Sequence, residues 1–227
     1  MWAVMKKELK SYFYSPIGYV FIGLFLAIFS FIFYITTISQ GAVTYQYVFF
    51  YSVMYIVIFL IPLLTMRTFS EERKNGTEQI LMTSPRSTVA IVLGKFLAAL
   101  VVIAITELFT LIYFGIICYF KTPDIPTVLV TMFGFLITSM AYISLGMFIS
   151  SLTENQIIAA AATIGIFVLS WLAPSISTKL TSISLIEKFY PFATGVFPVT
   201  ETISLISITV MFVALTMVVI KRRKLVK

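Results

Sequence analysis

The sequence of 227 residues has no histidine, one cysteine (Cys118) and one aspartate (Asp124). These counts exclude a Ser-His-Asp triad, histidine acid–base chemistry, a zinc site and an intrachain disulfide. The one Gly-Lys pair, Gly94-Lys95, is followed by Phe96 and lacks the upstream glycine of a Walker A loop. Most enzyme classes are therefore excluded, and any ATP-driven step needs a separate chain.

Charge is also scarce, at 11% of residues against about 25% in an ordinary soluble domain. Hydrophobic residues make up 60%, and the mean hydropathy is +1.05. A helix of about 20 apolar residues crosses a bilayer, so the apolar runs predict an all-α integral membrane fold with six transmembrane helices in a single domain, residues 1–227. The predicted spans are Ile17–Ile38, Tyr47–Met66, Val89–Ile117, Val128–Ile149, Ile157–Ala173 and Ile203–Ile220.

The basic residues outside the spans are distributed unequally between the two sides. Twelve belong to the N-terminal segment, the connection between spans two and three, and the C-terminal segment; only Lys121, Lys179 and Lys188 fall on the other side. Cytoplasmic segments carry the excess of Lys and Arg, so both termini are predicted to be cytoplasmic. The net charge of +7 then reflects topology and contact with anionic membrane lipids, and we expect no nucleic-acid partner.

The N-terminal 13 residues have the pattern of an amphipathic helix. Apolar residues recur at helical spacing with lysines on the other faces: Trp2, Met5, Leu9 and Phe13 against Lys6, Lys7 and Lys10. This pattern predicts a helix that lies in the membrane interface, and the alternative is a basic topology signal alone. Ser15-Pro16 is expected to turn the chain into the first span.

The longest polar interval, residues 67–87, has ordered helix signals. Thr68 and Glu71 fit a capping box, and Asn75-Gly76 supplies a left-handed residue that ends a helix. Thr77 is placed to cap a second short helix through Met82, which Ser84-Pro85 would stop. Such a helix could dock into a cleft on a partner, and the alternative is a solvated loop.

The run EERKNGTEQIL from Glu71 to Leu81, followed by Pro85, resembles the membrane subunits of type-2 ABC transporters, which are mostly exporters. The resemblance implies a coupling helix that contacts a separate ATPase subunit, with ATP and Mg bound by that subunit and no cofactor in this chain. It also implies a permease, not an enzyme, that pairs with a second permease subunit as a homodimer or heterodimer in a bacterial cytoplasmic membrane. The implied coupling residues are Glu71, Glu72, Arg73, Gly76, Thr77, Glu78, Leu81 and Pro85. We expect Glu71, Glu72 and Glu78 to pair with basic residues of the partner.

Two charged residues lie inside the third apolar run. Lys95 and Glu107 are twelve residues apart, about 18 Å along a helix, so they cannot pair with each other. Lys95 is expected to snorkel to the inner headgroups, which places Glu107 past the bilayer centre, facing protein or water. Glu107 is then either part of a polar translocation route or a hydrogen-bonded acid at a helix contact. Pro62 in the second span is either a hinge or a tolerated kink.

The outer segment Pro174–Glu201 is too apolar for an ordinary loop. Ser184–Phe189 and Val199–Leu205 are predicted to be short helices, and the residues alone leave re-entrant and surface-lying arrangements open. The family resemblance implies re-entrant helices that cap the exit.

These observations predict the permease subunit of an ATP-driven exporter. The alternative is an autonomous proton-coupled secondary carrier that uses Glu107, although no paired repeat supports it. A carboxylate enzyme and a membrane scaffold are weaker hypotheses. The apolar walls suit a lipid-like or amphiphilic cargo without identifying one.

Overall fold

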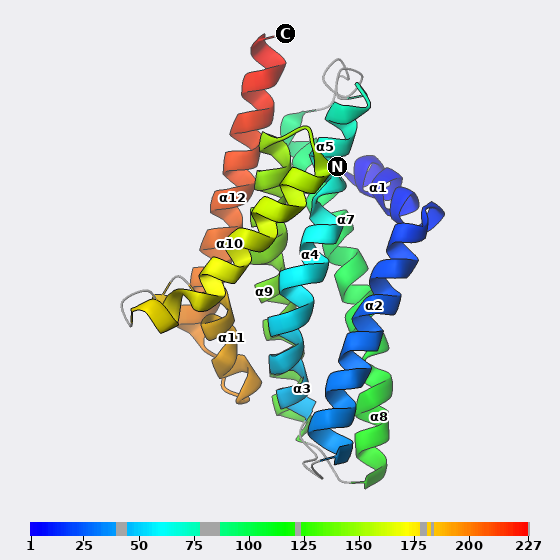
Figure 1. Cartoon of the computed structure of the whole chain (residues 1–227), viewed down its shortest axis with the longest axis vertical. Coiled ribbons are helices and arrows are strands. Elements are labelled where there is room, and N and C mark those ends of the chain that lie inside the picture. The colour runs from blue at the N-terminus through cyan, green and yellow to red at the C-terminus, as the bar shows by residue number, and fades with distance from the viewer. Residues whose placement is uncertain (40–44, 78–86, 121–123, 178–180, 183, 227) are drawn as a thin grey trace.

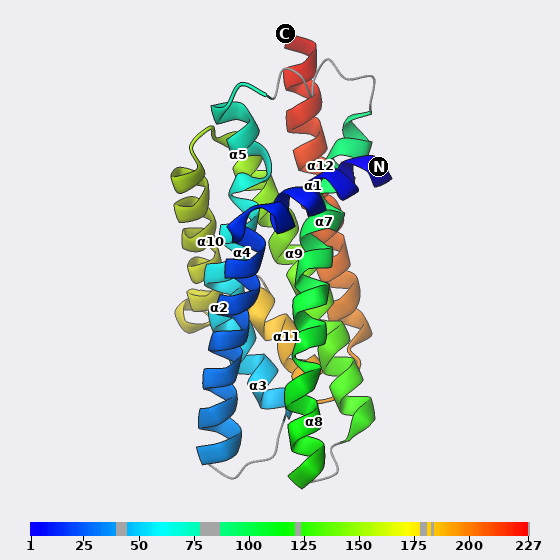
Figure 2. The same cartoon turned by 90° about the vertical axis from the view of Figure 1, so that its right-hand side faces the viewer.

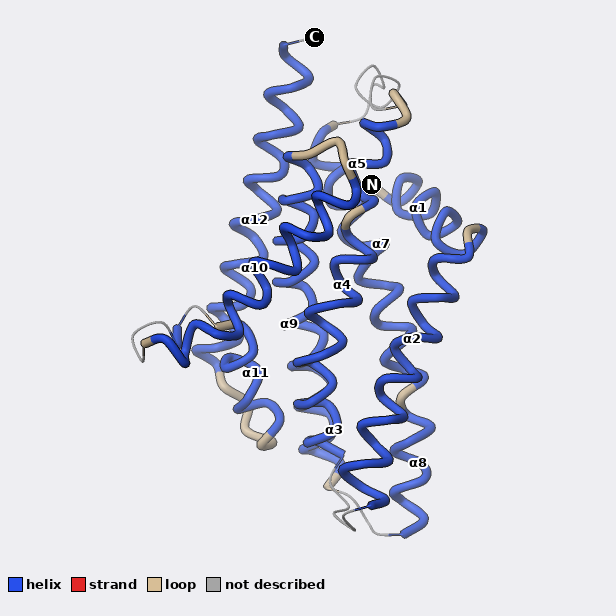
Figure 3. Tube along the Cα trace, in the orientation of Figure 1, coloured by secondary structure: helices blue, strands red, loops and turns tan. Residues whose placement is uncertain are grey.

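The structure, a computed structural model, describes residues 1–39, 45–77, 87–120, 124–177, 181–182 and 184–226. Within these ranges the chain is built of helices joined by short connections (Figure 3). In chain order the helices are α1 (Trp2–Tyr14), α2 (Pro16–Phe33), η1 (Tyr34–Ser39), α3 (Tyr45–Ser52), η2 (Val53–Val57), α4 (Ile58–Thr65), α5 (Arg67–Lys74), α7 (Thr88–Phe109), α8 (Leu111–Phe120), α9 (Ile125–Leu152), α10 (Gln156–Ile176), α11 (Leu185–Ala193) and α12 (Val199–Val226), where η marks a π-helix.

Six helical stretches in the described ranges are long and apolar enough to cross a membrane, as the sequence predicts. They are Pro16–Ser39, Val48–Lys74, Thr88–Phe120, Ile125–Leu152, Gln156–Ile176 and Val199–Arg223. The first four alternate in direction along the long axis, and the N-terminal helix and the C-terminus lie toward the same end (Figure 1). We call this the basic end, because the lysines and arginines of α1, α5 and the last turns of α12 gather there.

Helix α9 is the centre of the bundle and packs against α4, α5, α7, α10, α11 and α12. Small residues on α9 allow close approach, as is usual between membrane helices. A Cβ built on Gly146 would lie 2.9 Å from Cβ of Thr65, and one on Gly134 would lie 2.4 Å from Cβ of Phe192. Both glycines are therefore required by the packing of neighbouring helices.

Helix α1 lies across the ends of the spans and meets α2 at a sharp elbow (Figure 2). Ser15 is extended (φ −95°, ψ 154°) and Pro16 opens α2, so the predicted turn at this dipeptide is confirmed. Val4 and Tyr12 of α1 are buried against the bundle, whereas Trp2 is 71% exposed. Glu8 lies between Val4 and Tyr12 on this packed face. The placement of α1 in the membrane interface stays a prediction.

The second span runs into the polar interval with only a turn at Met66 between α4 and α5. The capping box predicted at Thr68 is wrong, because the Thr68 hydroxyl donates back to the carbonyl oxygen of Thr65 and no free helix start exists there. Gly76 has φ +69°, which confirms the predicted left-handed residue after Asn75. The second short helix, predicted from Thr77 through Met82, lies outside the described residues except for Thr77.

The outer segment contains one of the two predicted short helices. α11 begins after Ser184, whose Oγ accepts a hydrogen bond from the Glu187 N–H at 3.4 Å, and it extends through Pro191 to Ala193. The separate helix predicted at Val199–Leu205 is wrong: these residues form the first turns of α12, a continuous helix of 28 residues, about 42 Å long. The apolar residues after Leu205 continue the same helical ladder, so nothing ends the helix there.

Gly134 allows a direct test of the α9–α11 contact. Gly134→Ala is expected to destabilise the protein by about 1–3 kcal/mol, because Cβ and Cγ of Phe192 occupy the space a methyl group needs. Gly165→Ala in α10 is the matched control, since no atom lies within 4 Å of a Cβ built there. Thermal unfolding in detergent measures both. Equal unfolding temperatures for the two variants would contradict the assigned contact.

Candidate functional site

A buried cluster of three charged side chains joins three helices at the basic end. Lys95 of α7 has its Nζ 3.1 Å from Oε1 of Glu8 on α1 and 3.0 Å from Oε1 of Glu72 on α5. The side chain of Lys95 is 1% exposed, and those of Glu8 and Glu72 are 13% and 16% exposed. We call Glu8, Glu72 and Lys95 the Lys95 cluster.

The surroundings of the cluster are partly apolar and partly charged. The Lys95 ammonium lies 5.4 Å from the ring centroid of Phe69, within the range of a cation–π contact. Lys7, whose side chain is 65% exposed, approaches Glu8 at 3.8 Å and Glu72 at 3.7 Å from the solvent side. Two lysines thus face two glutamates, and the group is close to electrically neutral.

The structure corrects the expectation for Lys95. The sequence predicts that its amine snorkels to the headgroups, but the amine is buried between two carboxylates instead. Burial of a lone ammonium is costly, and paired carboxylates offset that cost. The pairing depends on Glu8, which the sequence analysis did not identify. Glu8 is four residues from both Val4 and Tyr12, and this spacing places all three on one face of the helix.

The close approach of α1 to α7 depends on Gly94, the neighbour of Lys95. A Cβ at Gly94 would lie 2.8 Å from Cβ of Val4 and 3.2 Å from the Met1 carbonyl oxygen. Tyr12, at the other end of α1, donates a hydrogen bond to the carbonyl oxygen of Leu64 at 3.3 Å. Burial raises the pKa of Tyr12, and the nearby Glu8 carboxylate raises it further. The hydroxyl therefore stays protonated and acts as a donor.

The predicted coupling residues of α5 have partners within the chain. Arg67 Nε donates to Glu71 Oε2 at 2.6 Å, Glu72 belongs to the Lys95 cluster, and Arg73 forms an ion pair with Glu154. Glu71 and Glu72 thus have partners within the chain, and their pairing with basic residues of an ATPase stays a prediction. Thr77 donates to the Glu72 carbonyl oxygen at 3.3 Å. Glu78, Leu81 and Pro85 lie outside the described residues.

Helix α5 is also anchored to the central helix. The Ser150 hydroxyl of α9 accepts hydrogen bonds from the Phe69 and Ser70 N–H groups at 3.2 and 3.3 Å, and it donates to the Met66 carbonyl oxygen at 3.0 Å. Together with the Arg73–Glu154 ion pair, these contacts join α5 to the last turn of α9 and to the connection that follows it. A displacement of α5 must therefore move α1, α7 and α9 as well.

Glu107 lies near the end of α7, twelve residues after Lys95 in the chain. It is 1% exposed, and its Oε1 has no hydrogen-bond partner among the described residues. Its backbone carbonyl oxygen accepts from the Thr110 hydroxyl at 2.6 Å, and the same hydroxyl lies 2.9 Å from the Tyr45 hydroxyl. As predicted, Lys95 and Glu107 are not brought together, since Lys95 pairs with Glu8 and Glu72.

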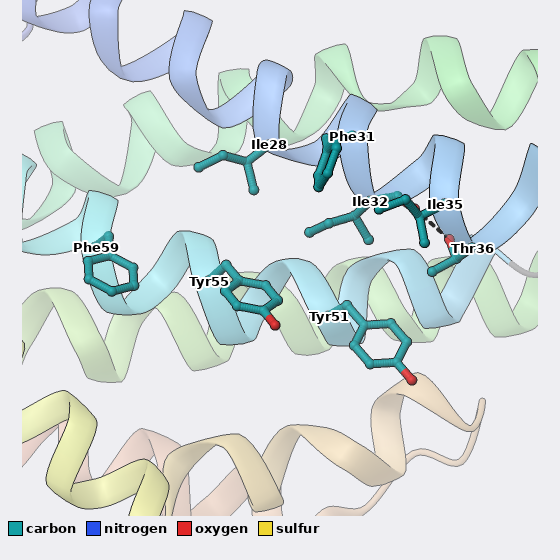
Figure 4. Close-up of a pocket in the computed structure, with 8 residues that line it drawn as sticks. All are labelled: Ile28, Phe31, Ile32, Ile35, Thr36, Tyr51, Tyr55 and Phe59. Carbon is teal, nitrogen blue, oxygen red and sulfur yellow. Dashed lines mark hydrogen bonds between the residues drawn. The ribbon is translucent and has the colours of Figure 1, made fainter. Parts of the chain in front are cut away.

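A lateral apolar groove of about 560 Å³ lies between the first two spans (Figure 4). Its walls are Ile28, Phe31, Ile32, Ile35 and Thr36 on one side and Tyr51, Tyr55 and Phe59 on the other. Both π-helices contribute to it, η1 through Ile35 and Thr36 and η2 through Tyr55. The groove has no charged side chain in its walls, so it suits acyl chains or other apolar groups.

The energetic role of the Lys95 cluster can be measured by removing its cation. Lys95→Met is expected to destabilise the protein by about 3–5 kcal/mol, because it leaves two largely buried carboxylates with only the exposed Lys7 as a counterion. Lys7→Met, the matched control, is expected to cost less than about 1 kcal/mol, since its ion pairs are solvent-exposed. Denaturant unfolding in mixed micelles compares the two. If Lys95→Met unfolds with the same midpoint as Lys7→Met, the cluster contributes no more than a surface pair.

Comparison with known proteins assigns the family. The family model for ABC-2 family transporter proteins matches residues 35–221, which is most of the chain and includes four of its six spans in full and nearly all of the last one. A search of curated proteins found no match. The family match agrees with the six apolar helices, and the matched range includes α5 and the segment after it. The chain therefore belongs to the ABC-2 transporter family, as a multi-pass membrane permease of the type-2 ABC transporters.

Proposed function

We propose that this permease couples ATP hydrolysis by a separate ABC ATPase subunit to export of a substrate across the cytoplasmic membrane of a bacterium. ATP and Mg are bound by the ATPase, and this chain supplies the membrane pathway together with a second permease subunit, either identical or related. Both termini and the segment after α5 face the cytoplasm in this proposal, because the basic end carries the excess of lysine and arginine.

The observation that carries the proposal is the position of the Lys95 cluster. Its Glu72 lies on α5, a few residues before the segment from Gly76 to Pro85 that we assign to ATPase contact. A force on that segment reaches α5 first, and α5 is joined to α1 and α7 by the cluster and to α9 by Ser150. Rigid helices that move together can act as a lever, whereas a loosely attached loop would absorb the motion.

Gly76 and Glu78 test the proposed ATPase contact. Gly76→Pro is expected to uncouple or dissociate the complex, because proline fixes φ near −65° where the native value is +69° and removes the N–H that donates to the Arg73 carbonyl oxygen. Gly76→Asn is the matched control, since asparagine tolerates the left-handed conformation. Glu78→Lys is expected to weaken ATPase retention by about tenfold or more through charge reversal.

The measurement is co-purification and ATPase activity after co-expression with ABC ATPase subunits from the same genome. Retention by the wild type and by Gly76→Asn, with loss in Gly76→Pro and Glu78→Lys, would support the proposal. If no ATPase associates, and the chain alone transports solutes along a pH gradient in liposomes, the secondary-carrier hypothesis centred on Glu107 replaces it.

The role of the Lys95 cluster in coupling requires milder variants than removal of the lysine. Glu72→Gln and Glu8→Gln each leave Lys95 one carboxylate partner, so the fold is expected to survive. Both variants are expected to retain the ATPase while substrate-stimulated hydrolysis falls, and Lys7→Gln is expected to behave as wild type. Unchanged stimulation in both glutamine variants would remove the cluster from the coupling route.

A further inference from the structure

A second groove lies at the elbow between α1 and α2, on the side of α1 away from the Lys95 cluster. It has a volume of about 490 Å³ and is lined by Lys6, Leu9, Lys10, Phe13, Tyr14 and Tyr19. The elbow is where the polar helix across the basic end meets the first span (Figure 2). The groove thus spans the boundary between a charged and an apolar region.

The apolar part of the groove continues into the first span. The rings of Phe13 and Tyr19 meet edge to face with centroids 6.2 Å apart, which joins the end of α1 to the beginning of α2. Below them Val20 and Leu24 are also exposed on α2, at 48% and 45%. An apolar chain lying against Phe13 and Tyr19 therefore finds a continuous apolar surface along α2.

The polar part of the groove carries positive charge without compensation. Lys6 and Lys10 are one helical turn apart, about 6 Å along the axis, and both are exposed. Neither forms an ion pair with a residue that the structure describes, whereas the adjacent Lys7 pairs with Glu8 and Glu72. None of the described residues that line the groove carries a carboxylate. Two unpaired ammonium groups at this spacing are complementary to a phosphate group.

We propose that this elbow groove is a specific binding site for one anionic phospholipid. The lipid phosphate lies between the Lys6 and Lys10 ammonium groups, and one acyl chain follows Leu9, Phe13 and Tyr19 toward α2. Charge complementarity selects an anionic headgroup, and the adjoining apolar wall selects a lipid over a free phosphate. The site lies on the helix that presents Glu8 to Lys95, so a bound lipid would hold α1 in the position that the Lys95 cluster requires.

The test is native mass spectrometry of the full-length chain in detergent, titrated with phosphatidylglycerol. The wild type is expected to bind one lipid with saturation. Lys6→Gln combined with Lys10→Gln is expected to weaken binding about 25-fold, or about fivefold for each lysine. Lys221→Gln combined with Arg222→Gln is the matched control: it removes the same charge from exposed positions at the same end and is expected to leave binding within about twofold.

Two further titrations separate the sources of the bound phosphate. Phosphatidylcholine, which has no net charge, is expected to bind at least tenfold more weakly, and glycerol 3-phosphate is expected not to displace the lipid. Equal losses in the two double variants would mean diffuse attraction to the basic end and would overturn the site. Displacement by glycerol 3-phosphate would assign the groove to a soluble phosphate and overturn the lipid. None of these readouts involves an ATPase, so the result is independent of the proposed transport function.

Discussion

Burial of the Lys95 amine is the constraint on which the basic end depends. A side chain that is 1% exposed cannot keep its charge without carboxylate partners, and α7 itself provides none. The partners come from a helix before the first span and from the end of the second, Glu8 on α1 and Glu72 on α5. Satisfying one ammonium group therefore fixes α1 against the bundle and sets the position of α5.

The central helix supplies a second constraint, which acts through shape instead of charge. Gly134 of α9 contacts Phe192 of α11, and Gly146 of α9 contacts Thr65 of α4. Both helices approach α9 more closely than a residue with a side chain at either position would allow. Ser150 then ties the next turn of α9 to α5. Close packing and a hydrogen-bonded hydroxyl thus complete the attachment of α5, which leaves the segment after Gly76 joined to a rigid base.

The distribution of polar groups separates two regions of the permease. Ion pairs gather at the basic end, where α1, α5, α7 and α9 are joined. The lateral groove between the first two spans has no charged wall, and its two π-helices interrupt the regular helical ladder there. In the proposed mechanism the charged region is the part of the permease that receives motion from the ATPase.

The sequence by itself determined the six spans, the elbow at Ser15-Pro16 and the left-handed Gly76, because each follows from local hydropathy or backbone preference. It also identified the family through the run from Glu71 to Leu81. Only the tertiary structure decided the partners of Lys95, because Glu8 is 87 residues away in the chain and no local pattern links the two. The same holds for the burial of Val4 and Tyr12 on α1 and for the pairing of Arg73 with Glu154, since which face of a helix is buried depends on the neighbour it meets.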